Sequence, residues 1–186
     1  MTDTGRFLTA LRRAFRSMFG ASGGASRNGS RSTDAAGRAS VSTGLLSPGQ
    51  TGASATVEVD PRRLRKVRLA YSPSPDGQPD PGEIVWTWVP YEERDGRGKD
   101  RPVVVVAASG AEAFLAVQLT SKAHDGSRDF VALGAGAWDP AGRPSWANID
   151  RVFRVHTAGM RREAASLDAK RYLKVAEALS ARYGWR

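Results

Sequence analysis

Residues 81–108 read PGEIVWTWVPYEERDGRGKDRPVVVVAA and carry the strongest structural signal of the chain. EIVWTWV (83–89) alternates in the manner of a half-buried strand, and PVVVVAA (102–108) is a β-branched run typical of a buried strand. The charged loop between them, residues 90–101, delivers Arg101 at the start of the second strand, where Pro102 fixes the backbone. Because a guanidinium grips phosphate bidentately and stays charged, this hairpin indicates a phosphate-handling site.

Further short strands follow the hairpin. Apolar or alternating runs predict strands over 112–119, 129–133 and 147–156, separated by turn-forming segments. The chain closes with a predicted helix that begins near Ser166 as its N-cap, with Asp168 in the first turn. The helix has an expected buried stripe of Leu167, Tyr172, Val175, Ala176, Leu179 and Tyr183. The pattern predicts a mainly β fold with a C-terminal helix (α+β), in which the helix packs across a small barrel-like sheet.

The N-terminal part has a different composition. Residues 20–56 are Gly, Ser, Ala, Thr and Arg with almost no bulky side chains, so they cannot bury enough surface to offset ordering entropy. A proline-punctuated spacer, SPSPDGQPDPG, follows at 72–82. We therefore expect a basic amphipathic helix within 1–20, a disordered basic linker or arm at 21–80 and a folded domain at 81–186.

Two N-terminal segments are strongly basic. Residues 5–19 place Phe, Leu and Met side chains on one helical face and four arginines on the other. Such a helix fits an anionic membrane surface or a partner's groove, or it is a poorly ordered solubilising segment. Residues 57–73 are expected to form a short strand or an arm laid along the domain, which would add phosphate contacts beside a nucleic-acid site, or else a solvated charge run in a linker. Their cations are Arg62, Arg63, Arg65, Lys66 and Arg68.

The bulk charge favours a polyanionic partner. The 186 residues carry a net charge of +9, and the pI is near 10.6, which suits nucleic acid or an anionic membrane face. The chain has no cysteine, which excludes disulfides and thiolate metal sites and suits a reducing cytoplasm. It also lacks an apolar run of about 18 residues and a signal-peptide pattern. We expect a cytoplasmic protein, with peripheral membrane contact through residues 5–19 as an alternative.

The absence of several motifs limits the kinds of catalysis that the sequence supports. The sequence contains no phosphate-binding glycine loop and no HExxH, and its two histidines, His124 and His156, lie in dissimilar settings. Neither a metal nor a cofactor is expected. Metal-free RNA cleavage instead needs a group to deprotonate the 2′-hydroxyl, a cation to stabilise the pentacovalent phosphate and a donor to its oxygens.

The chain offers a residue for each of these roles. Arg101 suits the cationic role, and Thr120, which ends the next predicted strand, can donate to phosphate oxygens. A loop carboxylate is the candidate base or orienting group. The further candidates for catalysis or substrate binding are Glu92, Glu93, Ser121, Lys99 and Lys122.

The hairpin resembles the opening of the PemK/MazF family of toxin endoribonucleases. LTSK (119–122), WANIDRVFRV (146–155) and SLDAKRYLKVAEAL (166–179) agree in the same order, so the resemblance spans about residues 81–186. It implies a small CcdB/MazF-like (SH3-like) barrel that forms a homodimer, binds an antitoxin across its RNA groove and cleaves single-stranded RNA without a metal. It makes Arg101, of the family's Arg-Pro step, and Thr120 catalytic, and Gly82 and Glu83 structural.

The chain departs from the family in two places. YEERDGRGKDRP (91–102) replaces the usual glutamate-glutamine-glycine run, which leaves the roles of Glu92 and Glu93 open. The basic extension before residue 81 is not part of the family core. The alternatives are therefore a non-catalytic nucleic-acid or protein-binding module, with DNA contact in a repressor complex, and a membrane-surface adaptor that uses residues 5–19.

Overall fold

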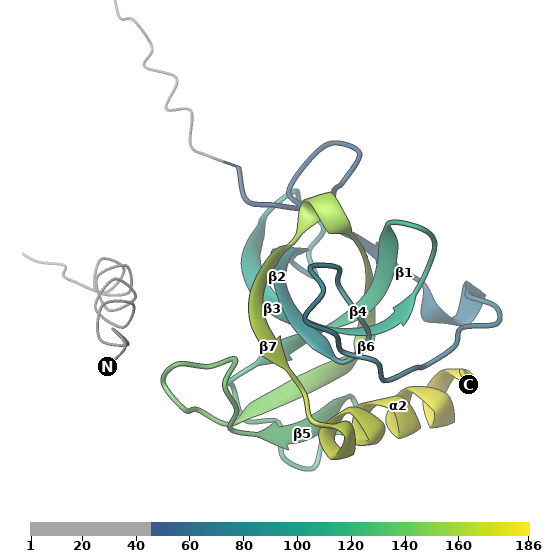
Figure 1. The fold of residues 1–186 in the computed structure, drawn as a ribbon, viewed down its shortest axis with the longest axis vertical. Helices are drawn as coiled ribbons and strands as arrows, with labels where there is room; N and C mark the ends of the chain where they lie inside the picture. The colour runs from purple at the N-terminus through teal and green to yellow at the C-terminus, as the bar shows by residue number, and fades with distance from the viewer. Residues whose placement is uncertain (1–45) are drawn as a thin grey trace, which may run out of the picture. The chain divides into compact units, whose positions relative to one another are not determined.

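The structure is a computed structural model, and it describes residues 46–186. These residues form an antiparallel sheet, two short 3₁₀ turns and one helix (Figure 1). The strands are β1 (Val57–Val59), β2 (Glu83–Pro90), β3 (Gly98–Ala108), β4 (Ala113–Thr120), β5 (Phe130–Gly134), β6 (Ser145–His156) and β7 (Arg161–Ser166). The turns are η2 (Pro61–Arg63) and η3 (Thr157–Gly159), and the helix is α2 (Ala169–Tyr183).

The sheet follows the order β1-β6-β4-β3-β2-β7, with β5 paired to the same edge of β6 as β1. Every pairing is antiparallel. The sheet curls on itself, and α2 lies across its lower part (Figure 1). The five strands predicted from the sequence correspond to β2 to β6, so the predicted mainly β fold with a C-terminal helix is confirmed.

Side chains of opposite parity along each strand build two apolar cores. The helix-side core lies on the sheet face that α2 covers, and Leu115, Val117 and Leu119 of β4 belong to it together with Val175 and Leu179. The inner core lies on the other face, inside the curl. It comprises Val85, Val89, Val103, Val105, Phe114, Ala116, Phe153 and Val155.

The start of α2 differs from the prediction. Asp168, not Ser166, is the N-cap, because its carboxylate accepts a hydrogen bond from the Arg171 amide at 2.8 Å. That amide hydrogen bond, followed by the ion pair with the Arg171 side chain, lowers the pKa of Asp168. Ser166 instead ends β7, a strand that the sequence did not predict because RREAAS lacks β-branched residues. The expected buried stripe is present, with Tyr183 half-buried at its end.

Residues 46–80 differ from the expected linker, because they pack on the domain. β1 pairs with Val152 to Arg154 of β6, and Val67 is buried in the helix-side core. Gly49, at φ +78°, lies where an added Cβ would collide with the hydroxyls of Thr56 and Thr87, so only glycine fits. Backbone pairing, the close approach at Gly49 and a few apolar side chains such as Val67 hold this segment.

The predictions for residues 1–45, namely the helix within 5–19 and the first part of the linker, lie outside the described residues. Within residues 46–186, no helix is both long enough and apolar enough to cross a bilayer.

Candidate active site

The β3–β4 register brings the two predicted catalytic residues together. The β3–β4 ladder pairs Val105 with Ala116 and ends at Val103 with Gln118; the same offset continued by two residues, beyond this last pair, would bring Arg101 across from Thr120. Both residues still belong to their strands. By alternation they lie on the inner-core face, at the end where its valines stop. Directly opposite residues have Cβ atoms about 5 Å apart, within reach of one phosphate group.

Arg101 lies in a cross-strand row of polar and aromatic residues. On its β2 side it pairs with Thr87, and on the far side of Thr120 is Trp146 of β6. The Thr87 hydroxyl is buried and donates to the Gly159 carbonyl at 2.6 Å, so it is already satisfied. Arg101, in contrast, is half-buried and makes no hydrogen bond or ion pair within residues 46–186. The guanidinium is therefore available to a ligand.

Thr120 is held by a local turn at the end of β4. Its hydroxyl accepts a hydrogen bond from the Lys122 amide at 3.1 Å, which leaves the hydroxyl proton free to donate. Ser121 and Lys122 are exposed immediately beyond it. Lys99, also exposed, has the same strand parity as Arg101. These residues surround the row with donors and cations.

The carboxylates of the first loop do not approach Arg101. Glu92 lies 3.9 Å from the buried guanidinium of Arg151, and Glu93 is exposed. The start of the loop is held in place by Arg151, whose guanidinium donates to the Pro90 carbonyl at 2.9 Å. Of the two candidate bases, Glu92 is the one that the fold places beside a groove.

Arg151 and Glu58 form an ion pair that the sequence did not predict. Their atoms approach to 2.6 Å, and Arg94 of the first loop lies 3.5 Å from the same carboxylate. Burial alone would raise the pKa of Glu58, but the hydrogen bonds and charges of Arg151 and Arg94 outweigh it and lower that pKa. The pair joins β1, β6 and the first loop, and no sequence motif signals it.

Two buried polar atoms beside the row lack a hydrogen-bond partner within residues 46–186. They are Oε1 of Gln118 and Nε1 of Trp146. Since buried polar groups are normally paired, they are candidate contacts for a ligand. Nearby, His124 and Phe130 stack with ring centroids 3.6 Å apart and planes within 4°. The sequence singled out His124, but neither Gln118 nor Trp146.

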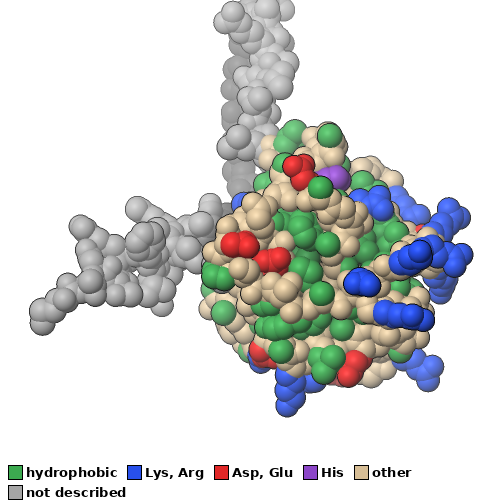
Figure 2. Space-filling view, turned by 45° about the vertical axis from the view of Figure 1, so that its right-hand side comes forward, with side chains coloured by type: hydrophobic (Ala, Val, Ile, Leu, Met, Phe, Trp, Pro, Cys, Tyr) green, Lys and Arg blue, Asp and Glu red, His purple; other side chains and the backbone are tan. Residues whose placement is uncertain are grey.

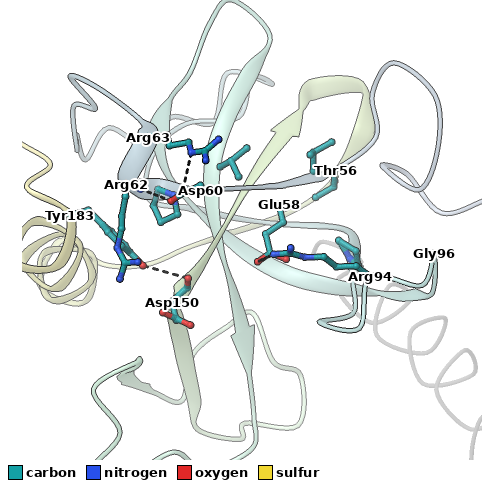
Figure 3. Close-up of a pocket in the computed structure, with 13 residues that line it drawn as sticks. Thr56, Glu58, Asp60, Arg62, Arg63, Arg94, Gly96, Asp150 and Tyr183 are labelled. Carbon is teal, nitrogen blue, oxygen red and sulfur yellow. Dashed lines mark hydrogen bonds and ion pairs between the residues drawn. The ribbon is translucent and has the colours of Figure 1, made fainter.

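A groove passes in front of the first loop (Figure 3). Its volume is about 810 Å³, with Arg62 and Arg63 at one end, Arg94 and Gly96 at the other, and Glu58 between them. A second depression of about 350 Å³ shares Glu58, Arg94 and Asp150 with it and continues to Glu92, Phe130 and Asn148. The described residues contain no group of three or more metal-ligating side chains.

The fold and the site define a small mainly β domain that presents an unpaired arginine beside a threonine hydroxyl, an arrangement suited to a phosphate-bearing ligand. Residues 80–182 match the family described as PemK-like, MazF-like toxin of type II toxin-antitoxin system. The chain belongs to this toxin family. No curated protein matches its sequence.

Solved structures of similar proteins have low sequence identity to the chain. One is a chain of a MazE-MazF crystal structure from Deinococcus radiodurans, at 19% identity and a TM-score of 0.44, over 58% of this chain and 97% of that one. MazF alone from the same organism gives 21% identity and a TM-score of 0.44, over 57% and 97%. An endoribonuclease from a mycobacterial species gives 15% identity and a TM-score of 0.42, over 58% and 94%.

Proposed function

We propose that this protein is a metal-independent endoribonuclease toxin that cleaves single-stranded RNA. The observation that carries the proposal is the unpaired Arg101 guanidinium on β3, beside the neighbouring strand β4 that ends at Thr120. Membership of the toxin family supports the same assignment.

The proposed reaction is an internal displacement at phosphorus. The 2′-oxygen attacks the adjacent phosphate, the bond from phosphorus to the 5′-oxygen breaks, and the products carry a 2′,3′-cyclic phosphate and a 5′-hydroxyl. The 2′-hydroxyl loses its proton, and the leaving 5′-oxygen gains one. Arg101 stabilises the charge that develops on the phosphate, and Thr120 donates to a phosphate oxygen.

No carboxylate of the first loop approaches Arg101, so we assign no residue as the base. Glu92 is proposed to orient the RNA, because that carboxylate lines the groove near Phe130 and Asn148, whereas Glu93 lies outside it. Ser121, Lys99 and Lys122 are proposed to bind the flanking phosphates, since they are exposed around the row. No resident metal or cofactor is proposed.

The decisive experiment incubates the purified chain with a single-stranded RNA pool of random sequence in EDTA and maps the cut ends. We expect cuts that leave cyclic phosphate and 5′-hydroxyl ends, and we expect Arg101→Ala and Thr120→Val to lose most of the activity. Arg143→Ala is the matched control, because Arg143 is an exposed arginine paired with Asp139. Absence of cutting by the wild type, or equal cutting by Arg101→Ala, would overturn the proposal.

We further propose that the toxin forms a homodimer and is neutralised by an antitoxin protein in the cytoplasm. Light scattering of the purified chain tests the dimer. Addition of the acidic product of a neighbouring reading frame to the cleavage assay tests the antitoxin, and full activity in its presence would reject that partner.

The second candidate function is a non-catalytic binding module, which the altered first loop favours. It predicts that the wild type binds RNA or DNA without cutting either. The first loop is stabilised by its own contacts, because the Tyr91 amide donates to the Arg97 carbonyl at 3.0 Å and the Arg97 side chain pairs with Asp95 at 2.7 Å. The mapping experiment separates the two functions directly.

A further inference from the structure

Residues 61–68, PRRLRKVR, form a cationic surface that the catalytic proposal does not use. Arg62, Arg63, Arg65, Lys66 and Arg68 are all exposed. No acidic residue occurs between Asp60 and Asp76. Only one ion pair involves these cations within the described residues, that of Arg63 with Asp60 at 3.3 Å. We refer to residues 61–68 as the basic segment.

The backbone of the basic segment is fixed although its side chains are exposed. Val67 is buried in the helix-side core, and Leu64 packs against the same core. The Arg186 amide donates to the Val67 carbonyl at 3.1 Å. Lys66 has φ +56°, a conformation that a non-glycine residue keeps only where its surroundings determine it. The cations are therefore held in place before any ligand binds.

The basic segment lies at one end of a groove that runs toward the candidate active site. Arg62 and Arg63 line one end of the groove whose other end is Arg94 of the first loop (Figure 3). Through Glu58 and Arg94 that groove joins the depression that contains Glu92 and Phe130. Neither hollow is lined by Arg101 or Thr120, but the depression reaches Asn148, two residues along β6 from Trp146, the partner of Thr120.

Carboxylates in this groove do not oppose an anion, because each already has a cationic partner. Glu58 pairs with Arg151 at 2.6 Å, Asp60 pairs with Arg63, and Asp150 pairs with Arg182. The unpaired charge that remains is positive. Lys and Arg side chains also gather along one side of the face shown in Figure 2.

We infer that the basic segment binds the phosphate backbone of single-stranded RNA that flanks the cleavage position. The inference rests on the proposed function and extends it, since the bound RNA would be longer than the stretch that Arg101 and Thr120 contact. Guanidinium forks bind successive phosphates, and Tyr183, which lines the groove, offers a ring for a base. RNA is favoured over a lipid surface because large exposed apolar side chains are scattered in the described part of the chain: Leu46, Val57, Tyr71 and Leu173.

The test compares Arg65→Gln/Arg68→Gln with Lys170→Gln/Lys174→Gln in the full chain. Each double variant removes two exposed cations that make no ion pair within residues 46–186, from the basic segment or from α2. Binding is measured by fluorescence anisotropy with 2′-O-methyl RNA, which cannot undergo 2′-hydroxyl attack. One probe has roughly 30 nucleotides and the other roughly six, so that only the longer one reaches beyond a local site.

We expect the basic-segment variant to bind the long probe about tenfold more weakly, with a salt slope smaller by about 1.4, because each single-strand phosphate contact contributes about 0.7. It should bind the short probe, and cleave a short RNA, within about twofold of the wild type, and the α2 variant should match the wild type on both. Equal weakening by the two variants, or weakening on the short probe as well, would overturn the inference. If the wild type cuts no RNA, the proposed function fails, while the probe comparison still decides this inference.

Discussion

Two arginines near the inner core have opposite surroundings. Arg151 is 7% exposed, lies over the Phe153 ring and is paired with Glu58 and the Pro90 carbonyl. Arg101 is half-buried and has no partner within residues 46–186. A buried charge that has lost its partner destabilises a fold strongly, whereas an unpaired surface cation contributes little to folding. The comparison separates an arginine that maintains the structure from one that is available for chemistry.

The largest expected effect is on catalysis by Arg101→Ala. We expect kcat/KM to fall about 10²–10³-fold, the usual loss when one donor to a developing oxyanion is removed. The free energy of unfolding should change by less than about 0.5 kcal/mol, as for other surface substitutions. Single-turnover cleavage and urea denaturation measure the two quantities. A loss of stability comparable with that of an Arg151 variant would remove the distinction between the two residues.

Arg151→Ala should show the reverse pattern. It leaves the Glu58 carboxylate without its main cation and the Pro90 carbonyl without a donor, which should cost about 3 kcal/mol of unfolding free energy. Arg63→Ala, in an exposed pair with Asp60, is the control and should cost less than about 1 kcal/mol. Urea denaturation of both variants checks the prediction, and equal midpoints would contradict it.

Acid should weaken the same ion pair. The pKa of Glu58 is lowered in the folded state, so its contribution to stability is present above the unfolded pKa and is lost as pH falls through the folded value. We expect stability to decrease below about pH 4.5, the ordinary value for a glutamate, and to decrease less steeply in Glu58→Gln. Thermal unfolding over pH 3–6 measures the two slopes, and parallel curves would argue against this role of Glu58.

The smallest expected effect is that of Arg94→Ala. Arg94 pairs with Glu58 at 3.5 Å, but its side chain is 75% exposed, so the pair should contribute less than about 0.5 kcal/mol to stability. Because Arg94 also lines the groove, we expect KM for RNA to rise about threefold with kcat unchanged. Steady-state kinetics test this expectation, and a change in kcat alone would place Arg94 closer to the chemistry than we propose.

Local sequence patterns were sufficient to predict the core of the fold. The β-branched run 102–108 and the alternation over 83–89 identify β3 and β2, and the apolar spacing after Ser166 identifies α2. A short strand or arm was one interpretation of residues 57–73, but the pairing partners of β1 were not predicted, because they lie in distant strands. The composition of a segment indicates how much apolar surface it can bury. It does not indicate whether the free edge of a distant strand is available for backbone hydrogen bonding.

The candidate site was predictable to a similar degree. Arg101 and Thr120 follow from their residue types near strand ends, and the structure places them on the neighbouring strands β3 and β4, while their roles stay a prediction. Gln118 and Trp146 escaped notice because an amide and an indole within apolar strands look like ordinary packing residues until neighbouring strands are aligned. Glu58 lies outside the expected domain, so its contact with Arg151 could not be foreseen.

Because side chains alternate between the two faces along β4, packing on one face of the sheet decides that Thr120 lies on the other. Leu115, Val117 and Leu119 are buried beneath α2, and only in that arrangement does Thr120 lie on the inner-core face. One residue inserted between Ala116 and Thr120 would exchange the two sets, driving the hydroxyl toward α2 and leucine toward the polar end of the inner-core face. Burial of these aliphatic side chains under α2 therefore fixes the face on which Thr120 lies. Insertions and deletions in this strand should be tolerated far less than exchanges among its aliphatic residues.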